Sequence, residues 1–202
     1  MVPAGVAPWK EGLLKALSKN KGLANAKYVQ IATVRPDGRP SNRTVVFRGF
    51  LRQITNDLTF ITDRRAKKVA EIAANPWAEV CWYFPNSREQ YRLGGSLTIV
   101  DETCADEVLA KARRDTWHNI SATGREQFSW PDPGLPRNQD RSEYDISMTE
   151  EESAIAAKEF CLMVLKVTEV DYLLLKGNTR HVFDIISGPE GTLEWQETDV
   201  NP

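Results

Sequence analysis

Basic side chains crowd one short segment of the sequence, Arg64 to Lys68, directly after a strand-like run that ends at Thr62 and Asp63. Thr62 or Asp63 is suited to cap the start of a helix and Asn75-Pro76 to stop it, so we predict a helix from Arg64 to Ala74. A helix N-terminus already carries a partial positive charge. Further cations in its first turn therefore indicate a bound anion such as a phosphate, although a solvated basic surface is the simpler alternative.

A second basic pattern lies upstream, in the run from Asn42 to Arg48. This run is β-branched and aromatic at its centre, with Arg43 and Arg48 towards its ends, and it favours a phosphate-bearing ligand over a solvated surface. Side chains alternate along a strand, so Arg43 and Arg48 are expected on opposite faces. Both can contact one ligand only if the strand twists, bulges or ends near Phe47.

The composition is that of one globular domain spanning residues 1–202. The chain is 41% hydrophobic and carries a formal net charge of -2, which does not suit a protein that coats nucleic acid or a membrane surface. It contains no apolar run long enough to cross a membrane, and residues 1–20 lack the apolar centre of a signal peptide. We therefore expect a cytoplasmic protein with no membrane and no nucleic-acid partner.

Cysteine and histidine are too sparse to suggest disulfides or a metal centre. Cys81, Cys104 and Cys161 are odd in number and widely spaced, which predicts free and mostly buried thiols. A zinc site is not expected, because no two cysteines lie close together. His118 and His181 have no apparent carboxylate partner in the sequence and are interpreted as surface or strand residues.

Hydrophobic periodicity predicts a mainly β fold with appended helices, of the α+β class. Strands are expected at 28–34, 43–48, 58–62, 78–84, 90–100, 160–167, 170–175, 179–186 and 192–197, and helices at 8–17, 64–74 and 101–118. Many strands joined by short turns indicate an antiparallel barrel. Gly94-Gly95 inside a strand predicts a bulge or a close backbone approach. The polar segment 131–152 is predicted to be a mobile loop.

Several linked motifs occur in a fixed order along about fifty residues. They are Arg43-x-Val45-Val46-x-Arg48, then Ile61-Thr62, then Lys67-Lys68 at the start of a helix closed by Asn75-Pro76, and then Gln90 ahead of a strand that contains glycine. This order resembles the FMN-binding split barrel of the pyridoxamine 5'-phosphate oxidase family and its cyanobacterial and plant relatives. The resemblance implies an antiparallel split β-barrel with FMN as its cofactor.

The resemblance also assigns residues to the FMN phosphate. It places Arg43 and Lys68 on the phosphate, with Lys67 and Thr62 beside them and Ile61 next to Thr62. Local charge alone does not decide whether the basic start of the helix is a ligand site or a solvated surface. Under the resemblance it would be a phosphate site.

Another set of residues would surround the flavin ring. The resemblance places Thr44, Val45 and Val46 along the isoalloxazine, with Arg48 and Gln90 near its polar edge. In this family the flavin lies at the interface of a homodimer. Arg180 would therefore reach the ligand from the partner chain, and Trp117 or Trp130 are further candidates to cover a face of the ring.

The residues that would recognise the substrate depart from the family pattern. Oxidases of this family hold the substrate phosphate with a Tyr, Arg and Ser set, where this chain has Trp117, Ser121 and Arg125. They also use an Arg-x-His pair where this chain has Lys176 and Asn178. The resemblance therefore supports FMN binding more strongly than it supports pyridoxamine phosphate as the small-molecule substrate.

Three functions remain open at this point. The first is an FMN-dependent oxidoreductase resembling pyridoxamine/pyridoxine 5'-phosphate oxidase, with its substrate unassigned. The second is an FMN-binding carrier or sensor without turnover, which the altered substrate residues favour. The third is an RNA- or protein-binding barrel that uses Arg64 to Lys68 with Trp82 and Tyr83, and the acidic overall charge argues against it.

Overall fold

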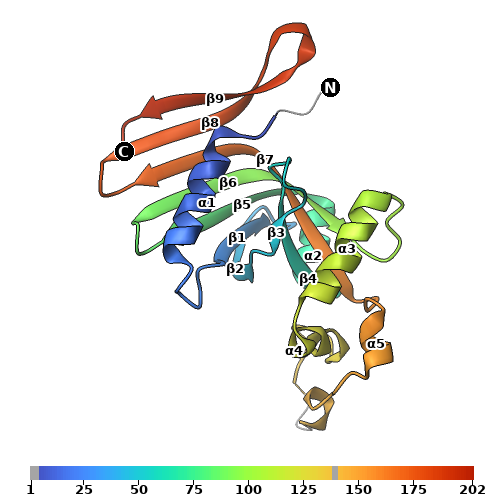
Figure 1. Cartoon of the computed structure of the whole chain (residues 1–202). Coiled ribbons are helices and arrows are strands. Elements are labelled where there is room, and N and C mark those ends of the chain that lie inside the picture. The colour runs from blue at the N-terminus through green and yellow to red at the C-terminus, as the bar shows by residue number, and fades with distance from the viewer. Residues whose placement is uncertain (1–4, 138–140) are drawn as a thin grey trace.

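One curled antiparallel sheet forms the body of the protein (Figure 1). The computed structural model describes residues 5–137 and 141–202. The strands are β1 (Tyr28–Val34), β2 (Pro40–Val46), β3 (Gly49–Phe50), β4 (Leu58–Asp63), β5 (Trp77–Phe84), β6 (Glu89–Val100), β7 (Phe160–Leu174), β8 (Thr179–Ser187) and β9 (Leu193–Val200). The helices are α1 (Pro8–Asn20), α2 (Lys67–Ala74), α3 (Glu107–Asn119), α4 (Ala122–Glu126) and α5 (Glu150–Ala154), with 3₁₀ turns at Gln127–Ser129, Ser142–Tyr144 and Pro189–Gly191.

The sheet follows the order β2-β1-β5-β6-β7-β4-β3, and β8 and β9 continue from β7. Every pairing is antiparallel. Strand β7 pairs with β4 through its first residues and with β8 through its last ones, so the two strands predicted at 160–167 and 170–175 are one continuous strand. The predicted fold class, antiparallel strands curled into a split barrel with appended helices, is confirmed.

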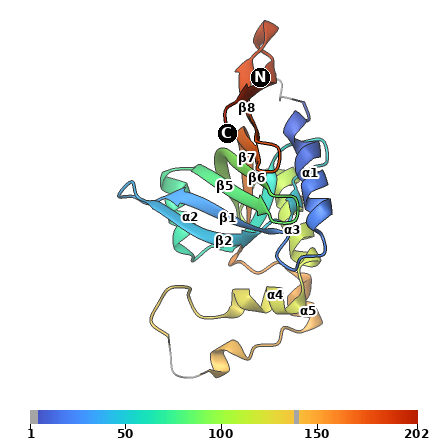
Figure 2. The ribbon, with the colours of Figure 1, turned by 90° about the vertical axis from the view of Figure 1, so that its left-hand side faces the viewer.

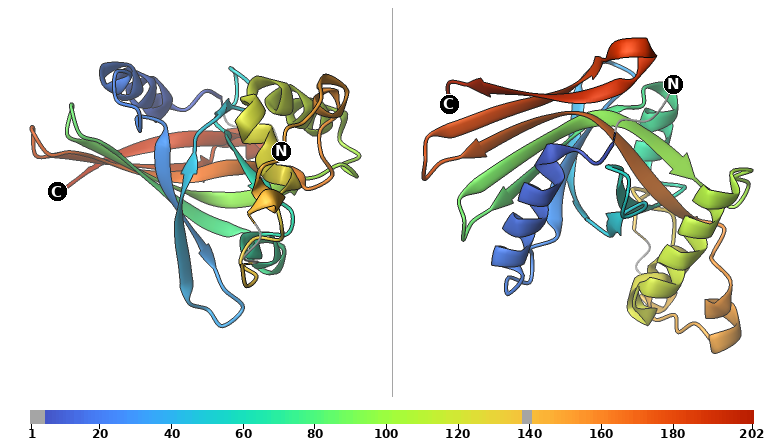
Figure 3. Two further views of the ribbon diagram at one scale, coloured as in Figure 1. Left: turned by 90° about the horizontal axis from the view of Figure 1, so that it is seen from below. Right: turned by 45° about the horizontal axis from the view of Figure 1, so that its top comes forward.

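Helix α1 lies against one side of the sheet (Figure 3), and aromatic side chains close the main core between them. Trp82 stacks on Phe84 with ring centroids 5.0 Å apart and lies 4.8 Å from Phe47. Trp9 of α1 contacts Trp195 of β9 edge to face, at 5.9 Å. Each of these rings removes a large apolar area from water, and together they fix α1 and the end of β2 against the sheet.

A second group of helices lies to one side of the sheet (Figure 2). Trp117, Ile120, Phe128 and Phe160 form a separate buried cluster that joins α3 and the turn after α4 to the start of β7. Helix α3 begins at Glu107 rather than at the predicted Asp101, because the Asp106 carboxylate accepts hydrogen bonds from the backbone N–H groups at the helix start.

The segment predicted to be a mobile loop, 131–152, contains local structure. It includes the 3₁₀ turn Ser142–Tyr144 and the start of α5, where Thr149 and Glu152 form a reciprocal capping box. Residues 138–140 lie outside the described residues. Mobility of this segment remains a prediction.

Two further expectations concern cysteines and membranes. All three cysteines are free thiols, but only Cys161 is fully buried, while Cys81 and Cys104 are half-buried. Among the helices that the structure describes, none is both long enough and apolar enough to cross a bilayer.

The predicted bulge is present at the glycine pair of β6. The β6–β7 register shifts between Gly94, which pairs with Glu169, and Gly95, which pairs with Val167. A Cβ at Gly95 would collide with the carbonyl oxygen of Lys166 and lie 3.0 Å from the Cα of Val167. The backbones of the two longest strands can therefore approach this closely only because residue 95 has no side chain.

We predict that Gly95→Ala lowers the free energy of unfolding by about 1–3 kcal/mol, the usual cost of an added methyl group in a tightly packed place. Gly22→Ala is the matched control, since a Cβ there meets nothing within 4 Å. Urea unfolding of both variants measures the difference. Equal midpoints for Gly95→Ala and Gly22→Ala would contradict the close approach.

Candidate functional site

A groove of about 520 Å³ lies between β2, the end of β4 and the segment that follows α4. Most of the residues predicted to bind a cofactor line it: Arg43, Thr44, Val45, Val46, Arg48, Ile61, Thr62 and Lys68. We call this the β2 groove. Trp130, Pro131, Leu135 and Tyr144 line its opposite wall. Trp130 was predicted as a possible cover for the ring, whereas the other three residues carry no signal in the sequence, because only the fold brings that segment back to β2.

Lys68 is one of two cations in the β2 groove that have no ion pair with a carboxylate among the described residues, and Arg48 is the other. Its Nζ donates a hydrogen bond to Thr62 Oγ1 at 3.0 Å, and Thr62 is itself buried. Burial and the neighbouring Arg43 guanidinium lower the pKa of Lys68 below its ordinary value. No carboxylate among the described residues forms an ion pair with it. A partly desolvated cation bound only to a hydroxyl favours an anionic ligand.

Arg43 is held by protein groups rather than left free. Its guanidinium donates to Glu71 Oε2 at 3.0 Å and to Ser41 Oγ at 2.6 Å, and it also bonds Thr33 Oγ1. Burial alone would raise the pKa of Glu71, but the hydrogen bonds from Thr33 and Arg43 bring it below its ordinary value. Arg43 therefore ties β2 to β1 and α2 and adds positive potential beside Lys68.

The start of helix α2 differs from the prediction. The helix begins at Lys67, not at Arg64, and its N-cap is Ala66, which offers no side-chain hydrogen bond. Neither Thr62 nor Asp63 caps it, because the Asp63 carboxylate instead accepts from the backbone N–H and the guanidinium of Arg65. The helix N-terminus is thus left without a capping side chain or an acidic residue in its first turn.

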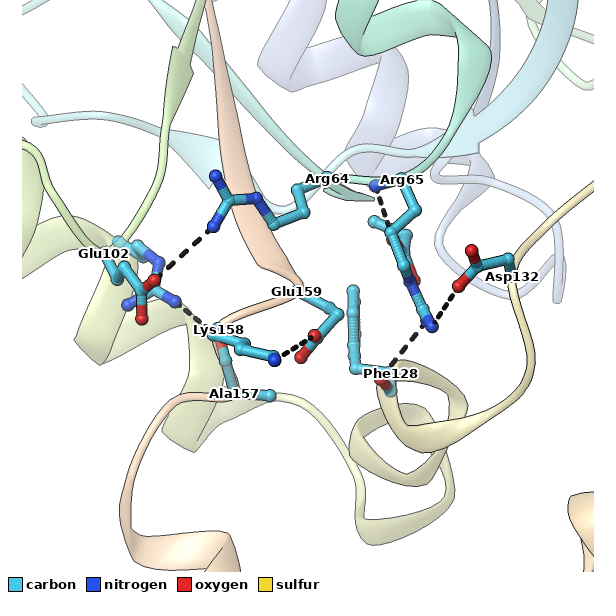
Figure 4. A network of polar contacts seen from close by, with 10 residues as sticks. Arg64, Arg65, Glu102, Phe128, Asp132, Ala157, Lys158 and Glu159 are labelled. Atoms are coloured by element: carbon cyan, nitrogen blue, oxygen red, sulfur yellow. Dashed lines mark hydrogen bonds and ion pairs between the residues drawn. The ribbon is translucent and has the colours of Figure 1, made fainter.

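Two of the four cations predicted to crowd the helix start are neutralised elsewhere (Figure 4). Arg65 pairs with Asp63 at 2.6 Å and with Asp132 at 2.9 Å, while Arg64 reaches Glu102 at 3.4 Å. Only the two lysines at positions 67 and 68 belong to the first turn of α2. The group of cations that could bind an anion at the start of α2 is therefore smaller than predicted and consists of Lys67 and Lys68.

Lys67 lies on the outer side of this site. Its side chain is exposed and lines a neighbouring cavity of about 800 Å³, together with Arg35, Pro36 and Asp37 of the β1–β2 turn. Arg43 and Lys68 line this cavity as well as the β2 groove. Arg43 and Lys68 therefore lie where the cavity and the β2 groove adjoin. Lys67 lines the cavity but not the β2 groove.

Arg43 and Arg48 line the same groove. This was predicted to be possible only if the strand twists, bulges or ends near Phe47, and the strand does end there. Strand β2 ends at Val46, and the backbone N–H of Arg48 turns to bond the carbonyl of Thr59 on β4. Strand alternation is broken before Arg48, so both arginines line the β2 groove. Burial lowers the pKa of the Arg48 guanidinium.

Gln90 and Arg180 lie elsewhere on the chain. Gln90 on β6 and Arg180 on β8 are both cross-strand partners of Leu173 on β7, so the three share one face of the sheet. Arg180 donates two hydrogen bonds to Asp171, at 2.9 and 2.7 Å. Neither residue lines the β2 groove of its own chain.

Two of the three positions at which the resemblance predicted substrate binding, 117 and 121, have structural roles here. Trp117 is fully buried in the second cluster and its indole N–H donates to the carbonyl of Ser153 at 2.8 Å. Its predicted role as a cover for a flavin ring is therefore wrong, whereas the half-buried Trp130 does line the β2 groove. The Ser121 hydroxyl accepts from Gly124 N and caps α4.

His181 has carboxylate partners that were not evident in the sequence. Its Nδ1 lies 3.0 Å from Glu197 Oε1 and 2.6 Å from Asp199 Oδ1. The antiparallel register of β8 and β9 brings these side chains onto one face. They lie outside the β2 groove.

Comparisons with known proteins agree with this geometry. Residues 6–101 match the family model described as the FMN-binding domain of pyridoxamine 5'-phosphate oxidase. The chain is 37% identical to pyridoxine/pyridoxamine 5'-phosphate oxidase 2 of Arabidopsis thaliana, over 98% of each chain. A solved pyridoxamine 5'-phosphate oxidase-related, FMN-binding protein of Nostoc punctiforme is 41% identical and superposes with a TM-score of 0.89, covering 98% of this chain and 99% of that one.

A more distant solved structure, PhzG of Burkholderia lata, shares the fold at 17% identity, with a TM-score of 0.69 over 96% of this chain and 90% of that one. Conservation of the fold at such low identity shows that the split barrel does not depend on the detailed sequence. The two nearer relatives match this chain over nearly its whole length, including the β2 groove. The chain therefore belongs to the pyridoxamine 5'-phosphate oxidase family of FMN-binding split-barrel proteins.

Proposed function

We propose that this protein binds FMN in the β2 groove and is a flavin-dependent oxidoreductase acting on a small molecule. The observation that carries the proposal is Lys68, a partly desolvated cation bound to a hydroxyl, beside a helix N-terminus without a capping side chain. A phosphate monoester supplies the missing negative charge and accepts several hydrogen bonds at once. Lys68 and Thr62 would hold that phosphate, with Arg43 and Lys67 adding positive potential.

The rest of the groove suits a flat aromatic ring. Val45, Val46 and Ile61 offer apolar surface, and Trp130 and Tyr144 face them from the other wall, with ring centroids 5.6 Å apart. Bound flavin supplies the redox chemistry by accepting two electrons from a substrate. The chain's own contribution is to bind the cofactor, orient it and exclude water from one face.

We propose further that the protein is a homodimer with FMN at the interface. Gln90 and Arg180 share one sheet face and do not line the groove of their own chain. A second copy could present that face to the groove. This arrangement accounts for why the predicted site divides between two surfaces of one chain.

Pyridoxine or pyridoxamine 5'-phosphate is the substrate suggested by the name of the Arabidopsis relative. An FMN-binding carrier or sensor is the second candidate. It is favoured by the structural roles of Trp117 and Ser121, which are committed to packing and capping instead of binding a substrate.

An RNA-binding role loses one of the two aromatic residues named for it, since Trp82 is buried while Tyr83 is exposed. Trp82 is 1% exposed and its indole N–H donates to the carbonyl of Ala26, so its ring is unavailable to stack on a base. Two of the four cations of the basic segment, Arg64 and Arg65, are likewise paired with carboxylates.

The first test is spectroscopic. We expect purified protein to show the visible absorbance of a flavin, and the released chromophore to have the mass of FMN. Anaerobic addition of pyridoxamine 5'-phosphate should bleach that absorbance, and oxygen should restore it. A flavin that no amine or alcohol substrate reduces would favour the carrier, and a protein that fails to bind added FMN would refute the cofactor assignment.

Lys68→Met should weaken FMN binding about 10- to 100-fold, which corresponds to loss of one charge-assisted contact. The same change should raise the melting temperature of the apo-protein by about 2–4 °C, the effect of about 1 kcal/mol in a domain of this size. The lowered pKa of Lys68 means that its charged form opposes folding at neutral pH. This cost declines as the pH rises through the folded pKa, so the two melting temperatures should converge at high pH.

Lys21→Met is the matched control, because Lys21 is an exposed lysine at the end of α1. It should change neither quantity. If Lys68→Met bound FMN as tightly as the wild type, the phosphate would lie elsewhere.

Complementation tests the proposed dimer. Arg180→Ala and Lys68→Met should each weaken FMN binding when expressed alone. A hybrid dimer of the two variants contains one site with both changes and one site with neither, so it should bind one FMN with wild-type affinity. Differently tagged chains, co-expressed and purified through both tags, provide the hybrid. If Arg180 acted within its own chain, every site of the hybrid would be defective.

A further inference from the structure

One histidine and two carboxylates meet on a single face of the β8–β9 hairpin. His181 of β8 is the cross-strand partner of Asp199 on β9, and Glu197 lies two residues before Asp199, so all three side chains share that face. The atoms that they offer to a metal ion lie within 4.8 Å of one another. We call these three residues the His181 cluster. A zinc site was not expected from the sequence, because only the pairing of the two strands brings these residues together.

Negative charge in the His181 cluster is not balanced by the protein. Neither Glu197 nor Asp199 has an ion pair or side-chain hydrogen bond with any described residue other than His181. The lysines of α1 that line the adjoining cavity are paired with other carboxylates. Even a protonated imidazole would offset only one of the two negative charges. The cluster therefore favours a cation.

The Nδ1 atom of His181 points to the same conclusion by a different route. It is shielded from solvent and makes no hydrogen bond. Two carboxylate oxygens lie 3.0 and 2.6 Å from it, but neither contact has the alignment that a hydrogen bond requires. A buried nitrogen without a partner costs free energy. A metal ion bound to its lone pair would satisfy the nitrogen and both carboxylates at once.

Small movements would let the three ligand atoms surround an ion. Neighbouring ligands of a tetrahedral Zn²⁺ with bonds of about 2.1 Å lie about 3.4 Å apart, so each oxygen would move away from Nδ1 by less than about 1 Å. The side chains of Glu197 and Asp199 are 47% and 87% exposed and have room to move. The imidazole is held in place, because it stacks on the ring of Tyr172 at an interplanar angle of 19°.

A cavity of about 310 Å³ between α1 and the sheet adjoins the cluster, and both His181 and Glu197 line it. Three protein ligands leave one position of a tetrahedral ion for water, and the cavity has room for that water. The ligand set also selects the class of metal. An imidazole suits transition metals, whereas Mg²⁺ and Ca²⁺ prefer oxygen ligands alone.

We propose that the His181 cluster binds a divalent transition-metal ion, and that Zn²⁺ is the ion its ligands suit best. The ion would join β8 to β9, which pairs with β8 alone among the described strands, and so hold this edge strand on the sheet (Figure 1). Arg180 precedes His181 on β8 and therefore lies on the opposite face. The metal site is thus separate from the proposed flavin site and does not depend on it.

The test uses protein that is purified without a histidine tag, stripped of metal with EDTA and titrated with Zn²⁺ in a calorimeter. One Zn²⁺ should bind per chain. At a hundredfold excess over the dissociation constant, Zn²⁺ should raise the melting temperature by about 5–10 °C, because an ion that binds only the folded chain stabilises it. Added EDTA should reverse this shift, and Mg²⁺ at the same concentration should not produce it.

His181→Gln, Glu197→Gln and Asp199→Asn should each weaken Zn²⁺ binding at least tenfold and abolish most of the thermal shift. His118→Gln and Asp184→Asn are the matched controls and should bind Zn²⁺ as the wild type does. His118 is the other of the two histidines and is exposed on α3, and Asp184 is an exposed carboxylate on the opposite face of β8. Thermal unfolding of each metal-free variant shows whether it is folded.

A wild-type protein that binds no Zn²⁺ would overturn the proposal, as would Zn²⁺ binding that all three cluster variants retain. Binding that persists in His181→Gln and is lost when the thiols are blocked would place the ion on a cysteine and would also overturn it. None of these measurements uses the flavin, so their outcome is independent of whether the protein binds FMN.

Discussion

The proposed phosphate site depends on the unbalanced charge of the Lys68 ammonium group. The two carboxylates whose charges act on Lys68 are already committed, Asp63 to Arg65 and Glu71 to Arg43 and Thr33. These pairings prevent the chain from neutralising Lys68 with its own groups. Charge is therefore held ready for a ligand at a cost in folding energy, which is how binding sites commonly trade stability for function.

The same ion pairs also make the site rigid. Arg43 and Glu71 connect β2 to α2, and Thr33 of β1 bonds both of them. Arg65 connects the end of β4 to Asp132 in the segment on the opposite wall of the β2 groove. Arg43 and Arg65 thus fix elements that line the β2 groove, and a preorganised site would lose less entropy on binding a ligand.

The sequence alone predicted those features that depend on interactions between residues close together in the chain. Most of the predicted strands and the Gly94-Gly95 bulge follow from side-chain periodicity and from the absence of a Cβ, and the structure has them, although the strands predicted at 160–167 and 170–175 are the single strand β7. The start of α2 was mispredicted because Asp63 had two possible uses, and the guanidinium of Arg65 takes it instead of the helix. Partners far along the chain, such as Asp132 for Arg65 or Glu197 for His181, become visible only when the sheet register and the helix packing are known.

Division of the site between two surfaces has a thermodynamic consequence under the proposed arrangement. If Gln90 and Arg180 of one copy complete the groove of the other, a ligand that bridges the two chains binds the dimer more tightly than the monomer. Linkage then requires FMN to strengthen dimerisation by the same factor by which dimerisation strengthens FMN binding. Asp171 would set the size of that factor, because Arg180 must keep or exchange its two hydrogen bonds to Asp171 when it meets the cofactor. A guanidinium already oriented by a carboxylate loses little rotamer freedom on binding, so this pair supports a rigid interface over one that forms only when the ligand arrives.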